Sequence, residues 1–151
     1  MLFWKKRPML DNDAQQRIVA AIKEAESSTS GEVRVFIEHN CTYMDAMHRA
    51  MEVFAKLEMH KTEKRNAVLV YLALTDRQFA IFGDADIYGK VGGQHFWDKA
   101  AESLKAHLRD NHVTEGLVSC IHELGKALSE HFPHDPGIKK NELPDEIVFG
   151  K

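Results

Sequence analysis

Two apolar segments separated by only four residues constrain the fold of this chain more than any other feature. Residues 66–74 and 79–83 are both typical of buried strands, and only 75–78 lie between them. Because so short a connection joins antiparallel neighbours, the two segments are expected to form a hairpin. The hairpin is expected to belong to a small sheet that helices cover.

Helical and extended patterns alternate along the rest of the chain. Apolar residues recur at three- and four-residue steps over 11–27, 43–59, 96–109 and 114–131, which predicts four helices. Residues 32–39 alternate between faces and predict a first strand. The order helix, strand, helix, strand, strand, helix, helix predicts a right-handed crossover between two parallel strands, followed by the antiparallel hairpin strand. The predicted fold is a Rossmann-like α/β protein, a three-layer α/β/α sandwich around a small mixed sheet.

The length of the chain predicts one domain, and its net charge indicates no class of charged partner. The 151 residues, 44% of them hydrophobic, suffice for one core, and we expect an α/β domain over 11–133. An N-terminal segment over 1–10 and a flexible, polar C-terminal tail over 134–151 are expected to flank it. The net charge of −3 shows no bias toward nucleic acid, so no nucleic-acid partner is expected. No export signal and no apolar run of the about 20 residues that a membrane span requires is seen, which predicts a cytoplasmic protein.

The predicted topology brings acidic residues together at one edge of the sheet. The start of the first strand at Glu32 should lie near the end of the third strand at Asp84, with Asp86 two residues further on. Carboxylate oxygens are the ligands that Ca²⁺ and Mg²⁺ prefer, which predicts a divalent-cation site. A simpler interpretation is also open, in which the acids face solvent and Glu32 or Asp84 pairs with Arg65.

Several short motifs resemble those of a known family. They lie at residues 30–35, 65–69, 79–84, 90–92, 96–97, 115–117 and 131–133. In this order and spacing they resemble the TPM domain, which is found in thylakoid-lumen and photosystem-repair proteins and in many bacterial proteins. The resemblance covers roughly residues 11–133 and implies an α/β/α sandwich.

The resemblance also implies a divalent-cation site at acidic loop residues, with calcium as the usual ion. Carried over by position, Glu32 and Asp84 are its candidate ligands, and Asp86 and Glu115 are further candidates. Acid phosphatase activity has been proposed for plant members, whereas most bacterial members have no assigned reaction. Many relatives carry an export signal and a transmembrane or glycine-rich segment that are not seen in this sequence.

The sequence therefore leaves two hypotheses about function. The first is a cation-binding interaction or assembly module whose partner is another protein. The second is a metal-dependent phosphatase, in which the ion polarises a phosphoryl oxygen of a phosphate monoester. The sequence favours the first, because no nucleophile or general acid accompanies the acidic residues and no catalytic residue can be named.

Overall fold

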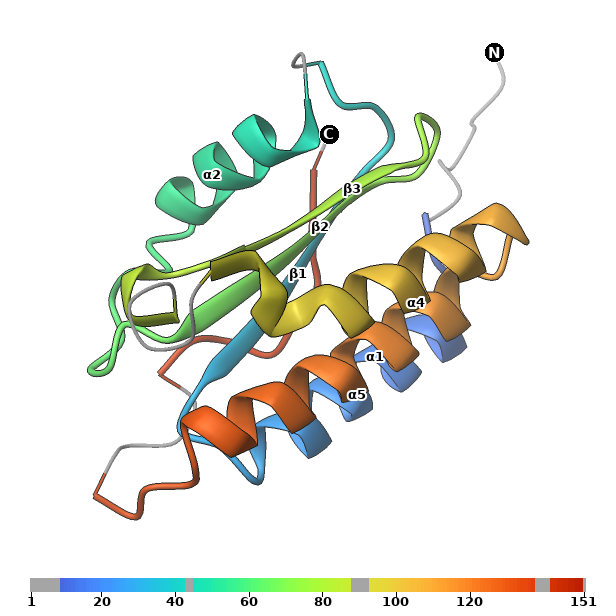
Figure 1. The fold of residues 1–151 in the computed structure, drawn as a ribbon. Helices are drawn as coiled ribbons and strands as arrows, with labels where there is room; N and C mark the ends of the chain where they lie inside the picture. The colour runs from blue at the N-terminus through green and yellow to red at the C-terminus, as the bar shows by residue number, and fades with distance from the viewer. Residues whose placement is uncertain (1–8, 43–44, 88–92, 138–141, 151) are drawn as a thin grey trace, which may run out of the picture.

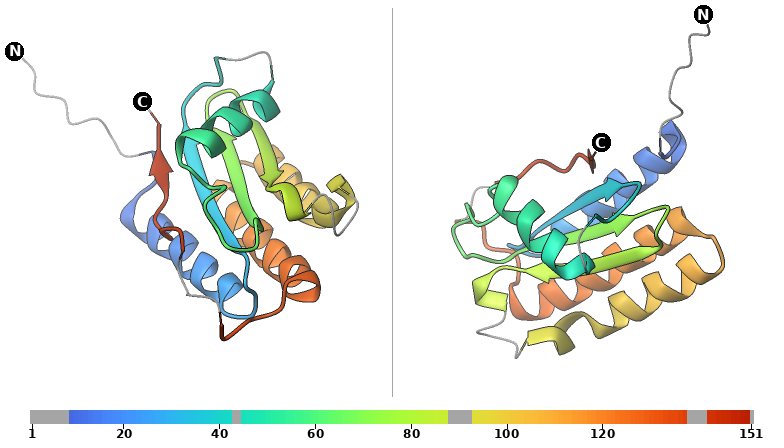
Figure 2. Two further views of the ribbon diagram at one scale, coloured as in Figure 1. Left: turned by 90° about the vertical axis from the view of Figure 1, so that its left-hand side faces the viewer. Right: turned by 90° about the horizontal axis from the view of Figure 1, so that it is seen from above.

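The computed structural model describes residues 9–42, 45–87, 93–137 and 142–150. Its elements are α1 (Asn12–Glu26), β1 (Glu32–Glu38), α2 (Ala46–Lys56), β2 (Ala67–Ala73), β3 (Gln78–Gly83), the 3₁₀ helix η1 (Gly93–Trp97), α4 (Asp98–Arg109), α5 (Val113–His131) and β4 (Val148–Phe149). The strands form one mixed sheet in the order β3-β2-β1-β4. Helices α1, α4 and α5 cover one face and α2 the other, so the expected α/β/α sandwich is confirmed (Figures 1 and 2).

The register of the sheet follows the topology expected from the sequence. Strands β1 and β2 are parallel, with Glu32 opposite Ala67, and β2 and β3 are antiparallel, with Leu69 opposite Phe82. Every residue of β1 and β2 is buried, because helices cover both faces of these two strands. The expected crossover and hairpin are therefore both confirmed.

Alternation along the strands divides the core between the two faces of the sheet. Val33 and Val68 belong to the core that faces α1, α4 and α5. Phe36, Leu69 and Tyr71 belong to the core that faces α2. Successive side chains of a strand point to opposite faces, so the position of a residue in its strand decides which helix layer it meets.

Polar side chains fix where two helices begin. The Asp11 carboxylate accepts a hydrogen bond from the Ala14 amide at 2.8 Å, and α1 begins directly after Asp11. Asp45 does the same for α2 through the His48 amide at 2.9 Å. The second helix is therefore shorter than the expected 43–59, and residues 43–44 lie outside the described part of the chain.

The C-terminal segment departs from the expected loose tail. Strand β4 pairs in parallel with β1 at Phe36 and Ile37, and the Gly150 amide donates to the Ile37 carbonyl at 2.8 Å. Leu143 is buried against the core that faces α2. Residues 142–150, here called the C-terminal strap, thus lie along the edge of β1 (Figure 2, left). Their only sequence signal was the short apolar run at 147–149.

None of the helices in the described ranges has the length and apolar character needed to cross a membrane.

Candidate cation site at the rim of the sheet

The register places two of the expected acidic residues in one row across the sheet. Glu32 is opposite Ala67, and the Asp84 amide donates to the Ala67 carbonyl at 2.9 Å. Neighbouring strands lie about 4.8 Å apart, so the Cα atoms of Glu32 and Asp84 are about 10 Å apart. Ala67 belongs to the core that faces α2, and residues paired across strands share a face. Both acids therefore lie on the α2 side of this end of the sheet, here called the rim.

Asp84 is a buried carboxylate that Arg65 holds with two hydrogen bonds. Arg65 donates from Nη2 to Asp84 Oδ1 and from Nε to Asp84 Oδ2, each at 2.8 Å. The Ala85 amide donates to Oδ1 at 2.7 Å. The Asp84 side chain is 4% exposed whereas that of Arg65 is 47% exposed. The simpler interpretation, an ion pair between Asp84 and Arg65, is thus present in the structure.

The backbone conformation of Arg65 favours its pairing with Asp84. Its φ angle of 51° lies in the left-handed region, which residues other than glycine rarely adopt. The Arg65 carbonyl accepts a hydrogen bond from the Asp86 amide at 3.2 Å. Main chain and side chain of Arg65 therefore both bind the loop that carries Asp84 and the exposed Asp86. The hydrogen bonds and the negative charge of Asp84 raise the pKa of Arg65 above its ordinary value.

Glu32 faces the C-terminal strap. Its side chain is buried, and its Oε1 accepts a hydrogen bond from the Leu143 amide at 2.9 Å. The row of the rim thus has an arginine-paired carboxylate at Asp84 and a strap-paired carboxylate at Glu32.

Glu115 lies far from the rim, although the family resemblance grouped it with the other acids. It stands in the first turn of α5, half exposed, and pairs with Arg17 of α1 at 3.4 Å. The other end of α5 reaches the rim side of the sheet, where the Phe132 carbonyl accepts a hydrogen bond from the Ser30 amide. His131 comes sixteen positions after Glu115 in this helix, which corresponds to a distance of about 24 Å. Glu115 therefore cannot share an ion with the rim.

The chemistry of the rim suits a hard cation, but its two buried carboxylates, Glu32 and Asp84, are held by other partners. Within the described ranges, no three His, Cys, Asp or Glu side chains converge closely enough to hold a metal ion. Asp84 and Asp86 supply oxygen ligands of the kind Ca²⁺ and Mg²⁺ bind. A cation could use the Asp84 carboxylate only after displacing the Arg65 guanidinium.

Two residues beneath the rim were not identified as site residues from the sequence. Asn66 is fully buried and donates from Nδ2 to Ser30 Oγ at 3.2 Å, while its Oδ1 has no hydrogen-bond partner among the described residues. Trp97 packs on Gly83, where an added Cβ would lie 2.7 Å from Cζ3 of the indole ring. For Asn66, the available sequence signal was a polar residue directly before an apolar strand.

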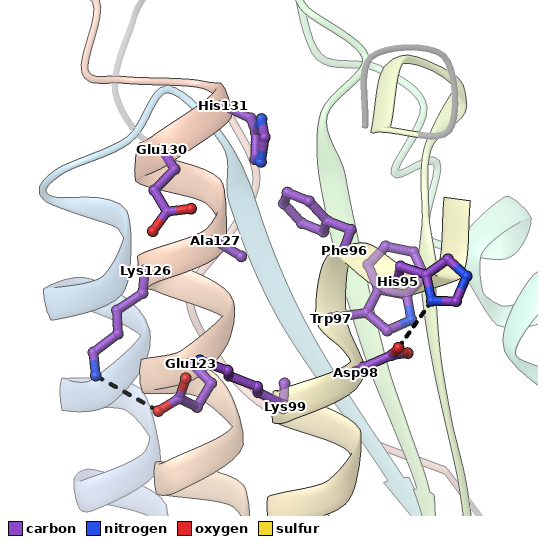
Figure 3. A pocket seen from close by; sticks show the side chains of 11 residues that line it. His95, Phe96, Trp97, Asp98, Lys99, Glu123, Lys126, Ala127, Glu130 and His131 are labelled. Atoms are coloured by element: carbon purple, nitrogen blue, oxygen red, sulfur yellow. Dashed lines mark hydrogen bonds and ion pairs between the residues drawn. The ribbon is translucent and has the colours of Figure 1, made fainter. Parts of the chain in front are cut away.

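A pocket of about 560 Å³ lies on the helix side, between η1, α4 and α5 (Figure 3). Phe96 and His131 face each other in it, with ring centroids 5.5 Å apart. Lys126 pairs with Glu123 at 3.6 Å. The pocket carries charges of both signs and shows no preference for an anion or a cation.

Comparison with known proteins agrees with this architecture. A family model described as the TPM domain matches residues 5–127. The chain belongs to the TPM domain family. The TPM domain resemblance of the short motifs is thereby confirmed, and the C-terminal strap lies beyond the matched residues. A search of curated proteins found no match.

Solved structures show the same TPM domain fold. The NMR structure of the BA42 protein from the psychrophilic bacterium Bizionia argentinensis is 36% identical, covers 97% of this chain and 99% of its own, and has a TM-score of 0.87. The N-terminal domain of the cg2496 protein from Corynebacterium glutamicum is 14% identical, covers 85% of this chain and 88% of its own, and has a TM-score of 0.64. The N-terminal domain of a P. gingivalis protein is 15% identical, with coverages of 84% and 83% and a TM-score of 0.63. The last two likenesses concern the fold alone.

Proposed function

We propose that this TPM domain binds a divalent cation, Ca²⁺ or Mg²⁺, at the rim and acts as an interaction or assembly module. The observation that carries the proposal is the pairing of buried Asp84 with half-exposed Arg65. A buried carboxylate needs a positive partner, and the arginine side chain supplies one from a position open to solvent. A divalent ion carries twice the charge of the guanidinium, and Arg65 can swing into water to admit it.

The ligands of such an ion would come from the end of β3 and from the start of β1, the two strands that flank Ala67 of β2. Asp84 would give its carboxylate, and the exposed Asp86 a second one. Glu32 stands in the same row and would reach the ion only by releasing the Leu143 amide. Ca²⁺ takes six to eight oxygens, so backbone carbonyls and water would complete the shell. Glu115 has no part in this site.

Binding would also change the surface that a protein partner meets. With the ion bound, the Arg65 guanidinium leaves its partner and projects into solvent at the rim. A partner with an acidic surface would then recognise the free guanidinium through bidentate hydrogen bonds. This exchange of charges supports the assembly role over a purely structural one.

A titration with Ca²⁺ and Mg²⁺, followed through backbone amide NMR signals, tests the proposal. The amides of residues 84–86 are expected to shift in the wild-type domain and not in Asp84→Asn. Arg65→Gln is expected to bind the ion severalfold more tightly, because it removes the competing guanidinium. Glu115→Gln is the matched control, with wild-type affinity expected. Unchanged spectra at millimolar Ca²⁺, or equal chemical-shift changes in Asp84→Asn, would contradict the proposal.

The alternative function is a metal-dependent phosphatase for phosphate monoesters. The specific observation in its favour is Arg65, whose guanidinium stands beside the carboxylates and would stabilise negative charge on a phosphoryl group. Hydrolysis of p-nitrophenyl phosphate that is lost in both Asp84→Asn and Arg65→Gln would support this alternative. Cation binding without turnover would support the assembly module.

A further inference from the structure

Strand β3 leaves one long edge of the sheet open. It is the last strand in the order β3-β2-β1-β4, and among the described residues it pairs with β2 alone. The register runs without a bulge from Gln78 opposite Ala73 to Gly83 opposite Val68. The six residues of β3 include no charged residue and no proline. Bulges, prolines and charged side chains usually protect an edge against a further strand, and β3 has none of them.

The backbone of β3 presents polar groups on this edge. The Asp84 amide donates to the carbonyl of Ala67 opposite it, so these two residues form a hydrogen-bonded pair. Opposite residues of an antiparallel ladder alternate between bonded and non-bonded pairs. Phe79 and Ile81 therefore fall in non-bonded pairs and direct their N–H and C=O groups away from β2. In the described part of the chain, no backbone group pairs with them on that side.

A groove of about 890 Å³ lies along residues 78–81 of β3. Helices α2 and α4, which lie on opposite faces of the sheet, supply its two walls (Figure 1). Half-buried Met47 lines one wall, and Met51, one helical turn further along α2, is 47% exposed. Trp97 and Ala101 line the other wall. Apolar side chains thus flank the open backbone groups on both sides.

Helix α4 runs in the opposite direction to β3. Trp97, directly before α4, packs on Gly83 at the end of β3. Arg77, directly before β3, donates from Nη1 to the Leu108 carbonyl near the end of α4, at 2.8 Å. Lys105 stands about one turn before Leu108. Arg77 and Lys105 therefore both lie at the end of the groove where β3 begins.

The charges of the groove favour an acidic occupant. Arg77 and Lys105 are exposed, and no carboxylate of the described residues pairs with either. Asp45 and Asp98 also line the groove, but each pairs with a neighbouring histidine. An acidic group at the start of β3 would therefore meet two cations that have no other carboxylate partner.

We propose that this groove binds an extended segment of another protein, which adds to the sheet as a further strand beside β3. The N–H and C=O groups of Phe79 and Ile81 bind the backbone of the segment, and its alternate side chains meet the two apolar walls. An antiparallel segment places its C-terminal end beside Arg77 and Lys105, so its acidic residues are expected at that end. The surface requires no cation at the rim.

The walls favour an extended segment over a second copy of the chain. A segment brings only one strand into the groove. A second copy would press its own α2 and α4 against these walls and bury their charged side chains. Burial of those charges costs desolvation free energy, which a single strand avoids.

Peptides of about nine residues, selected from a random phage-displayed library on the immobilised full chain, are the probes. The selected sequences are expected to alternate apolar residues and to carry acidic residues toward the C-terminus. Each is synthesised and titrated into the isotope-labelled chain. Exchange of the Phe79 and Ile81 amides with water should slow by about tenfold when nine-tenths of the chain is bound, because only the free chain then exchanges. The Ala80 and Phe82 amides already bond to β2 and should stay protected throughout.

A charge reversal tests the acidic preference. Lys105→Glu is expected to weaken binding of the selected peptides severalfold, because their acidic end then meets a carboxylate. Lys23→Glu, the same change at an exposed position of α1, is the matched control and should bind like the wild type.

No selected peptide, or bound peptides that leave exchange at Phe79 and Ile81 unchanged, would overturn the proposal. Sedimentation of the chain alone is expected to show a monomer. A dimer with both amides protected in the absence of peptide would overturn it in favour of a second copy. A chelator is present throughout, so the outcome is separate from that of the cation titration.

Discussion

Gly83→Ala tests how tightly the rim rests on the helix layer beneath it. An added Cβ would lie 2.7 Å from Cζ3 and 2.8 Å from Cη2 of Trp97, and 3.1 Å from Cδ1 of Ile87. Trp97 is 5% exposed and its rigid ring cannot fold away, so the ring and η1 must shift. Such overpacking costs about 1–3 kcal/mol, whereas replacing a strand glycine by alanine returns about 0.5–1 kcal/mol. The free energy of unfolding should therefore fall by about 1–2 kcal/mol, and Tm by about 2–8 °C.

Urea unfolding followed by circular dichroism measures this loss. Gly137→Ala is the control, because the nearest atom to its added Cβ would be Oδ1 of the half-exposed Asp135 at 3.3 Å. Trp97→Phe lacks the two ring atoms nearest Gly83 and loses buried contacts. The double variant should lose less stability than the two single changes summed, because the new methyl group fills the vacated space. Wild-type stability in Gly83→Ala, or strictly additive losses, would refute the packing argument.

Two further predictions concern the face toward α2 and the cysteines. Hydrogen bonds from Arg49 and Tyr71 lower the pKa of Glu38 although burial opposes this, so the carboxylate stabilises the fold above pH about 4.3 and its contribution is lost as the pH falls below that value. Glu38→Gln should lower the unfolding free energy by about 3 kcal/mol at pH 7 and by less at pH 3.5, as urea titrations at both pH values will show; equal losses would contradict this. Burial raises the pKa of the Cys120 thiol to about 12, so a thiol reagent should modify Cys41 alone in the folded chain and both cysteines in urea.

The sheet was predictable because its signals are local. The four-residue connection before Phe79 fixed the hairpin, and one strand-helix-strand unit implied a parallel pair of fixed hand. Once the topology is known, the register places Glu32 and Asp84 in one row without any knowledge of side-chain packing. The gathering of these two acids at the rim was predictable for the same reason.

The remaining features depend on contacts between distant parts of the chain. Strand β4 has two residues and pairs with β1 more than a hundred residues earlier, so no local pattern can establish it. Glu26 resembles any acidic residue at a helix end, and its hydrogen bond from the Val33 amide depends on how the end of α1 meets β1. Glu115 was grouped with the rim by family position, which carries no information on which end of α5 it occupies. Whether Asp84 faces solvent or pairs with Arg65 depends on the left-handed backbone of Arg65, which no local sequence pattern indicates.

Glu32 is part of the rim and also binds the C-terminal strap, and this has a thermodynamic consequence. Its Oε1 accepts the Leu143 amide and is also an oxygen that a cation at the rim would claim. If one ligand weakens another by a given factor, the second must weaken the first by the same factor. Added cation that uses this oxygen should accordingly loosen the strap, and detachment of the strap should raise the cation affinity. A single carboxylate oxygen is thus enough to couple the ion at the rim to the position of the C-terminal segment.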